Sequence, residues 1–422
     1  MDSRMPIRLF QPINEKGDKN MARELVRKQH QKIIEDHIDL HSELYIGTSQ
    51  AIHSKPEIGN QEFFASDTLT GILQHEGFEV TRNIAGHETG FIAKKTSSKE
   101  GPTIAFLAEY DALPGLGHAC GHNIIGTTSV AAGISLAQVL EETGGEVIVF
   151  GTPAEEGGPN GSAKGSFVKH GLFDGVDAAI IIHPAGQTGV TSPFLAVDPL
   201  DFHFYGKSAH AAAAPEQGVN ALDGVIQLFN GINALRQQLP TEVKIHGIIT
   251  NGGEAPNIIP EYASARFYIR ATNWKLCQEV SRKIRTVAEG AALATGSTVK
   301  VERFQNEVLD FVINPVLDEL LKEELAQLGE TVAPRKESGF GSTDAGNVSH
   351  VVPTAHPYIK IGPDELIAHT NEFRDCAKSQ AGDKAILTGA KALALTGYRL
   401  ISDKDLLDKV KTAFDEAKQT EK

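Results

Sequence analysis

Three segments of the chain share one layout, in which an apolar run that predicts a buried strand is followed at once by ionisable residues. The runs are Thr103–Ala108, Glu146–Gly151 and Ala178–Ile182. The residues that follow them are carboxylates and one imidazole, namely Glu109, Asp111, Glu155, Glu156 and His183. Because ligand sites in open α/β sheets form beyond the carboxyl ends of the strands, we expect these side chains to converge.

The first segment runs on into a thiol and an imidazole, Cys120 and His122. Thiolate, imidazole and carboxylate groups are all ligands of zinc-class metal ions. Catalytic sites of this class keep one coordination position open for water. The sequence therefore predicts a catalytic metal site at this edge of the sheet.

The adjacent glutamates Glu155 and Glu156 can take two different roles in such a site. Neighbouring side chains on an extended segment point in different directions, so one carboxylate can bind metal while the other faces a metal-bound water. A metal ion lowers the pKa of its water to near neutrality, and a nearby carboxylate can then take the proton as a general base. Adjacency alone leaves open which glutamate has which role.

Each of these residues also has an ordinary structural interpretation. A single buried cysteine is usually a small hydrophobic side chain, and isolated histidines and glutamate pairs are common without a function. Their joint position after successive strands favours a site. A cysteine hydrolase, with Cys120 as nucleophile and a histidine as base, is an alternative that leaves the glutamate pair without a role. The Cys-x-x-Cys element of zinc deaminases is absent from the sequence.

The order of elements changes once along the chain. Up to about residue 196 short apolar strands alternate with helical segments such as Gly126–Leu140, which predicts a mostly parallel sheet covered on both faces. From Val197 onward, half-buried strands and the helices Asn220–Leu239 and Leu276–Leu293 follow a β-α-β-β-α-β order. This order predicts a small α+β module of ferredoxin-like type, inserted into the larger domain.

The length of 422 residues exceeds the size at which one hydrophobic core stops growing, so two domains are expected. We expect an α/β fold in which a catalytic domain with a mostly parallel sheet carries the smaller α+β domain. The expected boundaries are 1–21 for a leader outside the fold, 22–196 and 306–422 for the catalytic domain, and 197–305 for the inserted domain.

Composition limits the partners and the compartment. The formal net charge of -14 spreads a negative field that repels phosphate backbones, so we expect no nucleic-acid partner. No apolar run is long enough to span a bilayer, and Met1–Met21 has no signal-peptide core. The three widely spaced cysteines are an odd and sparse set that favours a reducing compartment. We therefore expect a cytoplasmic protein without a membrane partner.

Five motifs, in this order along the chain, resemble those of the aminoacylase and carboxypeptidase metallopeptidase family. The branch that they resemble contains p-aminobenzoyl-glutamate hydrolases, indole-acetyl-amino-acid hydrolases and related cytosolic dipeptidases. The resemblance covers nearly everything from about Ala22 to Gly397. The motifs are Leu107–Asn123 (LAEYDALPGLGHACGHN), Gly151–Gly158 (GTPAEEGG), Gly206–Ala211 (GKSAHA), Asn257–Pro260 (NIIP) and Ala368–Phe373 (AHTNEF).

The resemblance implies a set of metal ligands and a base. One or two divalent ions would be bound, with zinc expected first and manganese, cobalt or nickel as alternatives. Glu155 would be the general base, and Asp111 would orient a ligand. The implied metal ligands are Cys120, His122, Glu156, His183 and His369.

The resemblance also implies roles for the inserted domain in dimerisation or as a lid. His210 would reach the active site of a partner subunit and stabilise the oxyanion, so we expect a homodimer or a dimer of dimers. Asn257 and Arg270 would hold the carboxylate of the substrate, a task that suits the planar fork of arginine. The implied activity is metal-dependent hydrolysis of the amide bond in N-acyl amino acids or dipeptides that bear a free carboxylate.

Two positions depart from the family pattern. Glu109 stands where many members have the histidine of a His-x-Asp motif, and Asn123 stands where many members of the branch have an aspartate. These departures leave the role of Asp111 and the number of metal ions open. A non-catalytic binding or regulatory protein on the same scaffold is the alternative from another functional class, and the completeness of the ligand set argues against it.

Overall fold

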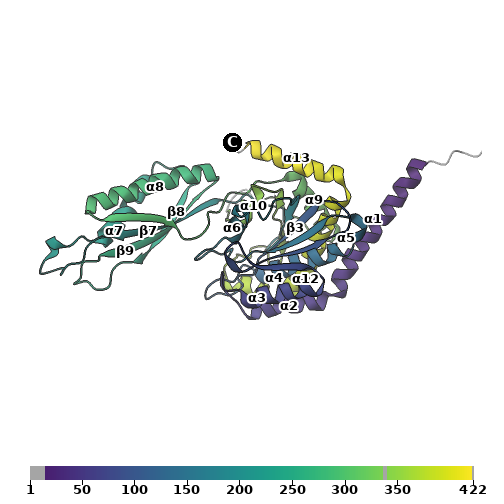
Figure 1. Cartoon of the computed structure of the whole chain (residues 1–422), viewed down its shortest axis with the longest axis horizontal. Helices are drawn as coiled ribbons and strands as arrows, with labels where there is room; N and C mark the ends of the chain where they lie inside the picture. The colour runs from purple at the N-terminus through teal and green to yellow at the C-terminus, as the bar shows by residue number, and fades with distance from the viewer. Residues whose placement is uncertain (1–14, 336–339, 421–422) are drawn as a thin grey trace, which may run out of the picture.

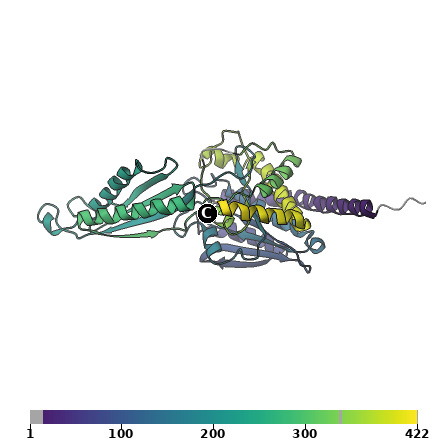
Figure 2. The same ribbon diagram turned by 90° about the horizontal axis from the view of Figure 1, so that it is seen from above.

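The computed structural model describes residues 15–335 and 340–420. These residues form two packed units that lie side by side along the longest axis of the molecule (Figures 1 and 2). The first unit is built around a six-stranded sheet, and the second around a four-stranded sheet. Among the described residues, no helix has the length and apolar character required to cross a membrane.

The six-stranded sheet has the strand order β1-β2-β4-β3-β5-β11. Strands β4, β3, β5 and β11 run parallel to one another, which confirms the mostly parallel sheet. The hairpin β1–β2 adds an antiparallel edge that the sequence analysis did not anticipate. The strands are β1 (Glu79–Ile84), β2 (His87–Thr96), β3 (Thr103–Ala108), β4 (Glu146–Gly151), β5 (Ala178–Ile180) and β11 (Thr354–Ala355).

Helices cover both faces of this sheet, which is why its central strands are apolar on both sides. In β3, Ile104 and Phe106 face one core, whereas Ala105 and Leu107 face the other. The first core is closed by α1 (Glu15–Leu40), α2 (Ser42–Ser54), α3 (Phe63–His75), α4 (His122–Ala137), α9 (Pro315–Gln327), α12 (Gln380–Ser402) and α13 (Lys404–Thr420). The second core is closed by α6 (Ala163–Lys169) and α10 (Ala345–Ser349).

The buried helix α4 begins at His122, four positions before the Gly126 expected from the apolar pattern. Its first residues are polar, and the sequence pattern gave no reason to bury them. In the fold Asn123 is buried, and its amide donates to Ser49 and to the carbonyl of Ala377. The helix can lie directly on the sheet because its residues are small: a Cβ on Gly133 would stand 2.5 Å from Val149 Cγ2.

Short elements link these layers. His183 lies in β6 (His183–Ala185), which pairs in parallel with β12 (Tyr358–Lys360) in a separate two-stranded sheet. Residues 15–21, which the sequence analysis assigned to a leader outside the fold, belong to α1, and residues 1–14 lie outside the described residues. The beginning of α1 extends beyond the body of the molecule (Figures 1 and 2). The remaining short helices are α5 (Leu140–Thr143), η1 (Pro215–Gln217) and α11 (Asn371–Cys376).

The second unit has its own core and the expected β-α-β-β-α-β order. Its sheet has the order β10-β7-β9-β8, with every neighbouring pair antiparallel. One face is packed against two helices, whose first turns are capped by the side chains of Asn220 and Asn273. The elements are β7 (Ala196–Tyr205), α7 (Ala221–Arg236), β8 (Lys244–Asn251), β9 (Tyr262–Ala271), α8 (Trp274–Thr295) and β10 (Thr298–Arg303).

Candidate metal centre

The turn before α4 brings two of the predicted ligands against the strand that carries a third. Gly121 precedes the helix with a φ of 77°, and a Cβ at this position would stand 2.5 Å from Pro184 Cγ. Only glycine combines this left-handed backbone with so close an approach. As a result, Cys120 Sγ lies 3.4 Å from His183 Nε2.

A buried carboxylate orients His122. The Nδ1 of His122 donates to Asp111 Oδ1 at 2.8 Å, and neither side chain is exposed. The second oxygen, Asp111 Oδ2, accepts the backbone N–H of Glu156 at 3.0 Å. Burial would lower the pKa of His122, but Asp111 and Cys120 outweigh it and raise the pKa well above its usual value. Its buried Nε2 has no hydrogen-bond partner among the described residues, and a metal ion that bound there would take the place of the proton on this atom.

His183 is fixed in the same way by its own backbone neighbour. Its Nδ1 donates to the carbonyl of Pro184 at 2.7 Å, which leaves Nε2 as the acceptor that faces Cys120. Burial lowers the pKa of His183 to about 4, so the ring is neutral at physiological pH. A neutral imidazole with a free Nε2 is the form that ligates a metal ion.

The surroundings of the Cys120 thiol favour a cation nearby. Burial, and after it the Glu156 carboxylate, raise the pKa of Cys120 well above its usual value. A thiol in such surroundings stays protonated unless a positive charge comes close, and a metal ion is the usual source of that charge.

The fifth predicted ligand, His369, lies in the loop that precedes α11. His369 has a φ of 65°, and its backbone N–H donates to the carbonyl of Ala119 at 2.9 Å. This contact places His369 Nε2 at 3.4 Å from Glu156 Oε2. The side chain of His369 is 54% exposed, so the cluster opens to solvent on this side.

In the part of the chain that the structure describes, potential ligand atoms lie in four groups, each within 4.8 Å. Three of them contain the predicted ligands and overlap, namely Cys120 with His122 and His183, Cys120 with Glu156 and His369, and His122 with Glu155 and Glu156, and the fourth joins Glu109, Glu155 and Asp344. Two buried atoms at their centre, His122 Nε2 and Glu156 Oε1, are 3.9 Å apart and have no hydrogen-bond partner among the described residues. Buried polar atoms without a partner are costly, so their position favours a cation between them. The mixture of sulfur, nitrogen and oxygen donors fits an ion of the zinc class.

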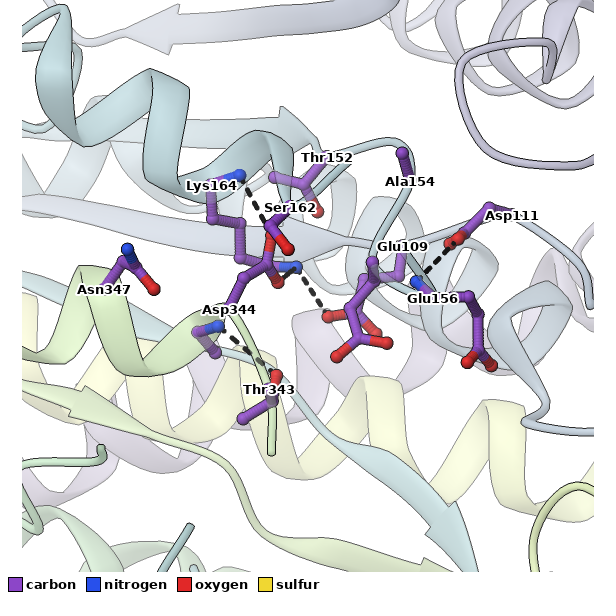
Figure 3. A network of polar contacts seen from close by, with 12 residues as sticks. Glu109, Asp111, Thr152, Ala154, Glu156, Ser162, Lys164, Thr343, Asp344 and Asn347 are labelled. Atoms are coloured by element: carbon purple, nitrogen blue, oxygen red, sulfur yellow. Dashed lines mark hydrogen bonds and ion pairs between the residues drawn. The ribbon is translucent and has the colours of Figure 1, made fainter. Parts of the chain in front are cut away.

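Next to this cluster lies a buried ion-pair network that the sequence analysis missed (Figure 3). Lys164 Nζ lies 2.7 Å from Glu109 Oε1 and 2.5 Å from Asp344 Oδ1, and none of the three side chains is more than 1% exposed. Burial alone would lower the pKa of Lys164, but Asp344 and Glu109 outweigh it and raise the pKa. The surrounding sequence, Ser162-Ala163-Lys164-Gly165, carries no pattern that would distinguish Lys164 from a surface lysine.

The three predicted site residues from 197–305 lie on the second unit. The exposed His210 uses its Nδ1 to accept the backbone N–H groups of Ala212 and Ala213, and the carbonyl of Asn257 accepts from Ala211. These contacts place His210 and Asn257 in the second unit rather than in the metal cluster. Arg270, on β9, is half-buried and donates through Nη1 to Ser342 Oγ of the first unit at 2.8 Å.

Known proteins resemble this chain over most of its length. Residues 105–397 match the model of peptidase family M20/M25/M40. The chain is 38% identical to the Xaa-Arg dipeptidase of Mus musculus, with 90% of each chain covered. It is 29% identical to one of the subunits of the p-aminobenzoyl-glutamate hydrolase of Escherichia coli K12, with 92% of this chain and 96% of the relative covered.

Solved structures show the same fold at lower identity. An aminobenzoyl-glutamate utilization protein from Klebsiella pneumoniae superposes with a TM-score of 0.66 at 20% identity, over 84% of this chain and 98% of that chain. A Bacillus subtilis protein described as a dinuclear metal-binding peptidase of the M20 family superposes with a TM-score of 0.63 at 20% identity, over 86% and 99% of the two chains. The resemblance on which the sequence analysis relied is confirmed: the chain belongs to peptidase family M20/M25/M40, and it is a metal-dependent hydrolase of amide bonds.

Proposed function

We propose that the chain hydrolyses the amide bond of N-acyl amino acids or dipeptides that carry a free carboxylate. The observation that carries this proposal is the convergence of five ligand-type side chains beside Glu155. The relatives support the substrate class, because their names point to an Xaa-Arg dipeptide, p-aminobenzoyl-glutamate and, at 28% identity, indole-3-acetyl-aspartic acid. All three compounds join an acyl group to an amino acid through an amide.

The metal would be held by the cluster described above. Cys120 belongs to two of the ligand groups, so its sulfur would contribute to metal binding with either set of partners. A bound ion of the zinc class supplies a Lewis acid for the amide carbonyl and makes water a stronger nucleophile at neutral pH. The proposed ligands are Cys120, His122, Glu156, His183 and His369.

Glu155 is the proposed general base. Its Oε2 lies 3.8 Å from His122 Nε2, and its side chain is 13% exposed, so it borders both the ligands and the solvent. Burial raises the pKa of Glu155 well above its usual value, and the carboxylates of Glu109 and Glu156 raise it further. A carboxylate with a raised pKa is a stronger base, and it is therefore better suited to take a proton from the attacking water and return it to the leaving nitrogen.

Substrate would bind between the two units. Arg270 is proposed to pair with the free carboxylate of the substrate, because its guanidinium crosses from β9 to Ser342 of the first unit. A cavity of about 160 Å³ beside His183, lined in part by Gln187, Ser192 and Leu366, is the proposed site for a substrate side chain.

A homodimer would complete the site with His210 and Asn257 from the second unit. Strand β8 is an edge of the four-stranded sheet, and it exposes Ile248 at 63% and Ile249 at 46%. An exposed apolar edge of this kind is a template for pairing with a second copy.

A cytoplasmic location belongs to the same proposal, since all three cysteines are free thiols.

The contact between Cys120 and His183 also suits a cysteine hydrolase, which is the second candidate. A nucleophilic cysteine needs a lowered pKa, however, whereas the surroundings of Cys120 raise it. Removal of metal ions with a chelator separates the two mechanisms, because a cysteine hydrolase needs no metal ion and would stay active, whereas a metal-dependent hydrolase would lose its activity.

Cys120→Ser should lower both the metal content and the rate, because a hydroxyl is a poor substitute for a thiolate as a ligand of zinc-class ions. We expect a loss of metal affinity of at least about 10- to 100-fold, measured by titration with a competing chelator. Cys376→Ser, which changes the half-buried thiol of α11, is the matched control and should keep its metal. Full metal occupancy in Cys120→Ser would make Cys120 a structural residue.

Glu155→Gln should abolish most of the turnover and leave the bound metal near the wild-type amount, since the residue acts on water rather than on the metal. General-base catalysis contributes about a hundred- to ten-thousand-fold, so we expect kcat to fall by that factor. The measurements are kcat on an N-acyl amino acid and metal analysis of the same sample. Retention of most of the activity would show that Glu155 is not the base.

His210→Ala should reduce kcat by about a hundred- to a thousand-fold and leave the metal content intact, because an oxyanion donor acts mainly in the transition state. The trans role is tested by mixing inactive His210→Ala with inactive Glu155→Gln and allowing subunits to exchange. Mixed dimers then contain one site in which both groups are intact, and part of the activity returns. If exchange is demonstrated and no activity returns, His210 does not act across the interface.

A further inference from the structure

Lys164 is a fully buried cation that the proposed reaction does not use. It lies in the first turn of α6, and its ammonium lies between Glu109 Oε1 at 2.7 Å and Asp344 Oδ1 at 2.5 Å (Figure 3). Burying an ammonium group is costly unless it is paired and hydrogen-bonded, so its place in the fold requires these two carboxylates.

The two carboxylates form a triad with the proposed base. Oxygen atoms of Glu109, Glu155 and Asp344 all lie within 4.8 Å of one another, a spacing at which carboxylates can hold a divalent ion. The ammonium of Lys164 is in direct contact with two of the three. It therefore fills the space between Glu109 and Asp344, two of the three carboxylates that a metal ion in the triad would have to contact.

A backbone hydrogen bond holds this arrangement on one side, and a side-chain contact joins it to the metal cluster on the other. The N–H of Lys164 donates to Asp344 Oδ2 at 3.1 Å, so one carboxylate holds both the backbone and the ammonium of the same residue. On the other side, Glu109 Oε2 lies 3.6 Å from His122 Nε2, which is one of the proposed ligand atoms. The network thus reaches from α10 to the edge of the metal cluster.

We propose that Lys164 is a built-in cation of the site, which occupies the Glu109–Glu155–Asp344 triad, excludes metal ions from it and so reserves Glu155 for its role as base. Lys164 is a positioning residue in this account, since it acts through the carboxylates and touches no reacting atom. The role of Glu155 comes from the proposed function, whereas the occupation of the triad stands on the geometry of Lys164 alone.

A lysine neutralises the charge of the triad and leaves Glu155 free to accept a proton, whereas a second metal ion would not leave it free. An ammonium is a compact charge with three donors, and it neutralises the carboxylates without coordinating them tightly. A divalent ion in the triad would bind Glu155 directly and take away the lone pair with which it accepts a proton. The expected consequence of losing the lysine is therefore a gain of metal together with a loss of rate.

Lys164→Met keeps the length of the side chain and removes the charge. The zinc-loaded enzyme is dialysed against Mn²⁺, and the bound Mn²⁺ is counted by electron paramagnetic resonance. We expect one more Mn²⁺ per chain than in the wild type, a kcat lower by about 10- to 100-fold, and a KM changed only slightly. Lys164→Arg should bind no extra Mn²⁺ and should recover part of the kcat.

Lys169→Met is the matched control, because it makes the same change at the end of the same helix, where the lysine is half-exposed and contacts Glu307. It should match the wild type in Mn²⁺ count and in kcat. Lys164→Gln replaces Lys164→Met if the latter does not fold, because its shorter neutral side chain can donate to one carboxylate while leaving the space between the carboxylates open, and the same extra Mn²⁺ is expected.

The double variant Lys164→Met/Asp344→Asn locates the additional ion. With one carboxylate of the triad removed, the extra Mn²⁺ should disappear. Equal Mn²⁺ counts in Lys164→Met and the wild type, an extra Mn²⁺ that persists in the double variant, or a wild-type kcat in Lys164→Met would each overturn the proposal. The Mn²⁺ count needs no activity, so it distinguishes this failure from a failure of Glu155 as the base.

Discussion

The candidate site depends on one buried carboxylate, Asp111, which ties three segments of the chain together. One of its oxygens accepts from His122 Nδ1 and the other from the backbone of Glu156. The end of β3, the start of α4 and the loop after β4 are therefore held in one geometry, and the bond from Nδ1 of His122 to Asp111 leaves its Nε2 on the side of the cluster. This position fits the proposed role of Asp111, which is to orient two proposed ligands from outside the cluster.

Charge balance is the second constraint on this part of the molecule. The carboxylates of Glu109, Asp111, Glu155, Glu156 and Asp344 are buried or nearly so within one small region. Burial and neighbouring carboxylates raise the pKa values of Glu155 and Asp344. Burial would also raise the pKa of Glu109, but Lys164 and the nearby histidines outweigh it and lower that pKa. Cations remove this cost, and the chain supplies one of its own in Lys164, while the cluster of sulfur, nitrogen and oxygen donors suits a metal ion as the other.

The sequence predicted the parts of the site that follow directly from strand ends. Apolar runs that are buried on both faces are visible as such, and for this reason β3 and β4 have the predicted bounds and their polar successors meet. His369 could be connected with them only by resemblance, because it comes from a loop late in the chain. Lys164 and Asp344 were missed because a buried ion pair looks like two surface charges until the fold brings its partners together. The hairpin β1–β2 was missed because β1 is largely exposed and has no apolar alternation.

The central claim is that Cys120, as a thiolate, and the surrounding imidazoles bind the metal ion on which hydrolysis depends. X-ray absorption at the edge of the divalent ion found in the purified protein tests it most directly, because sulfur and nitrogen or oxygen neighbours differ in scattering and in distance. For zinc, the account predicts a sulfur neighbour at about 2.3 Å together with nitrogen or oxygen neighbours at about 2.0–2.1 Å. A fully occupied metal whose shell contains only nitrogen and oxygen would contradict it.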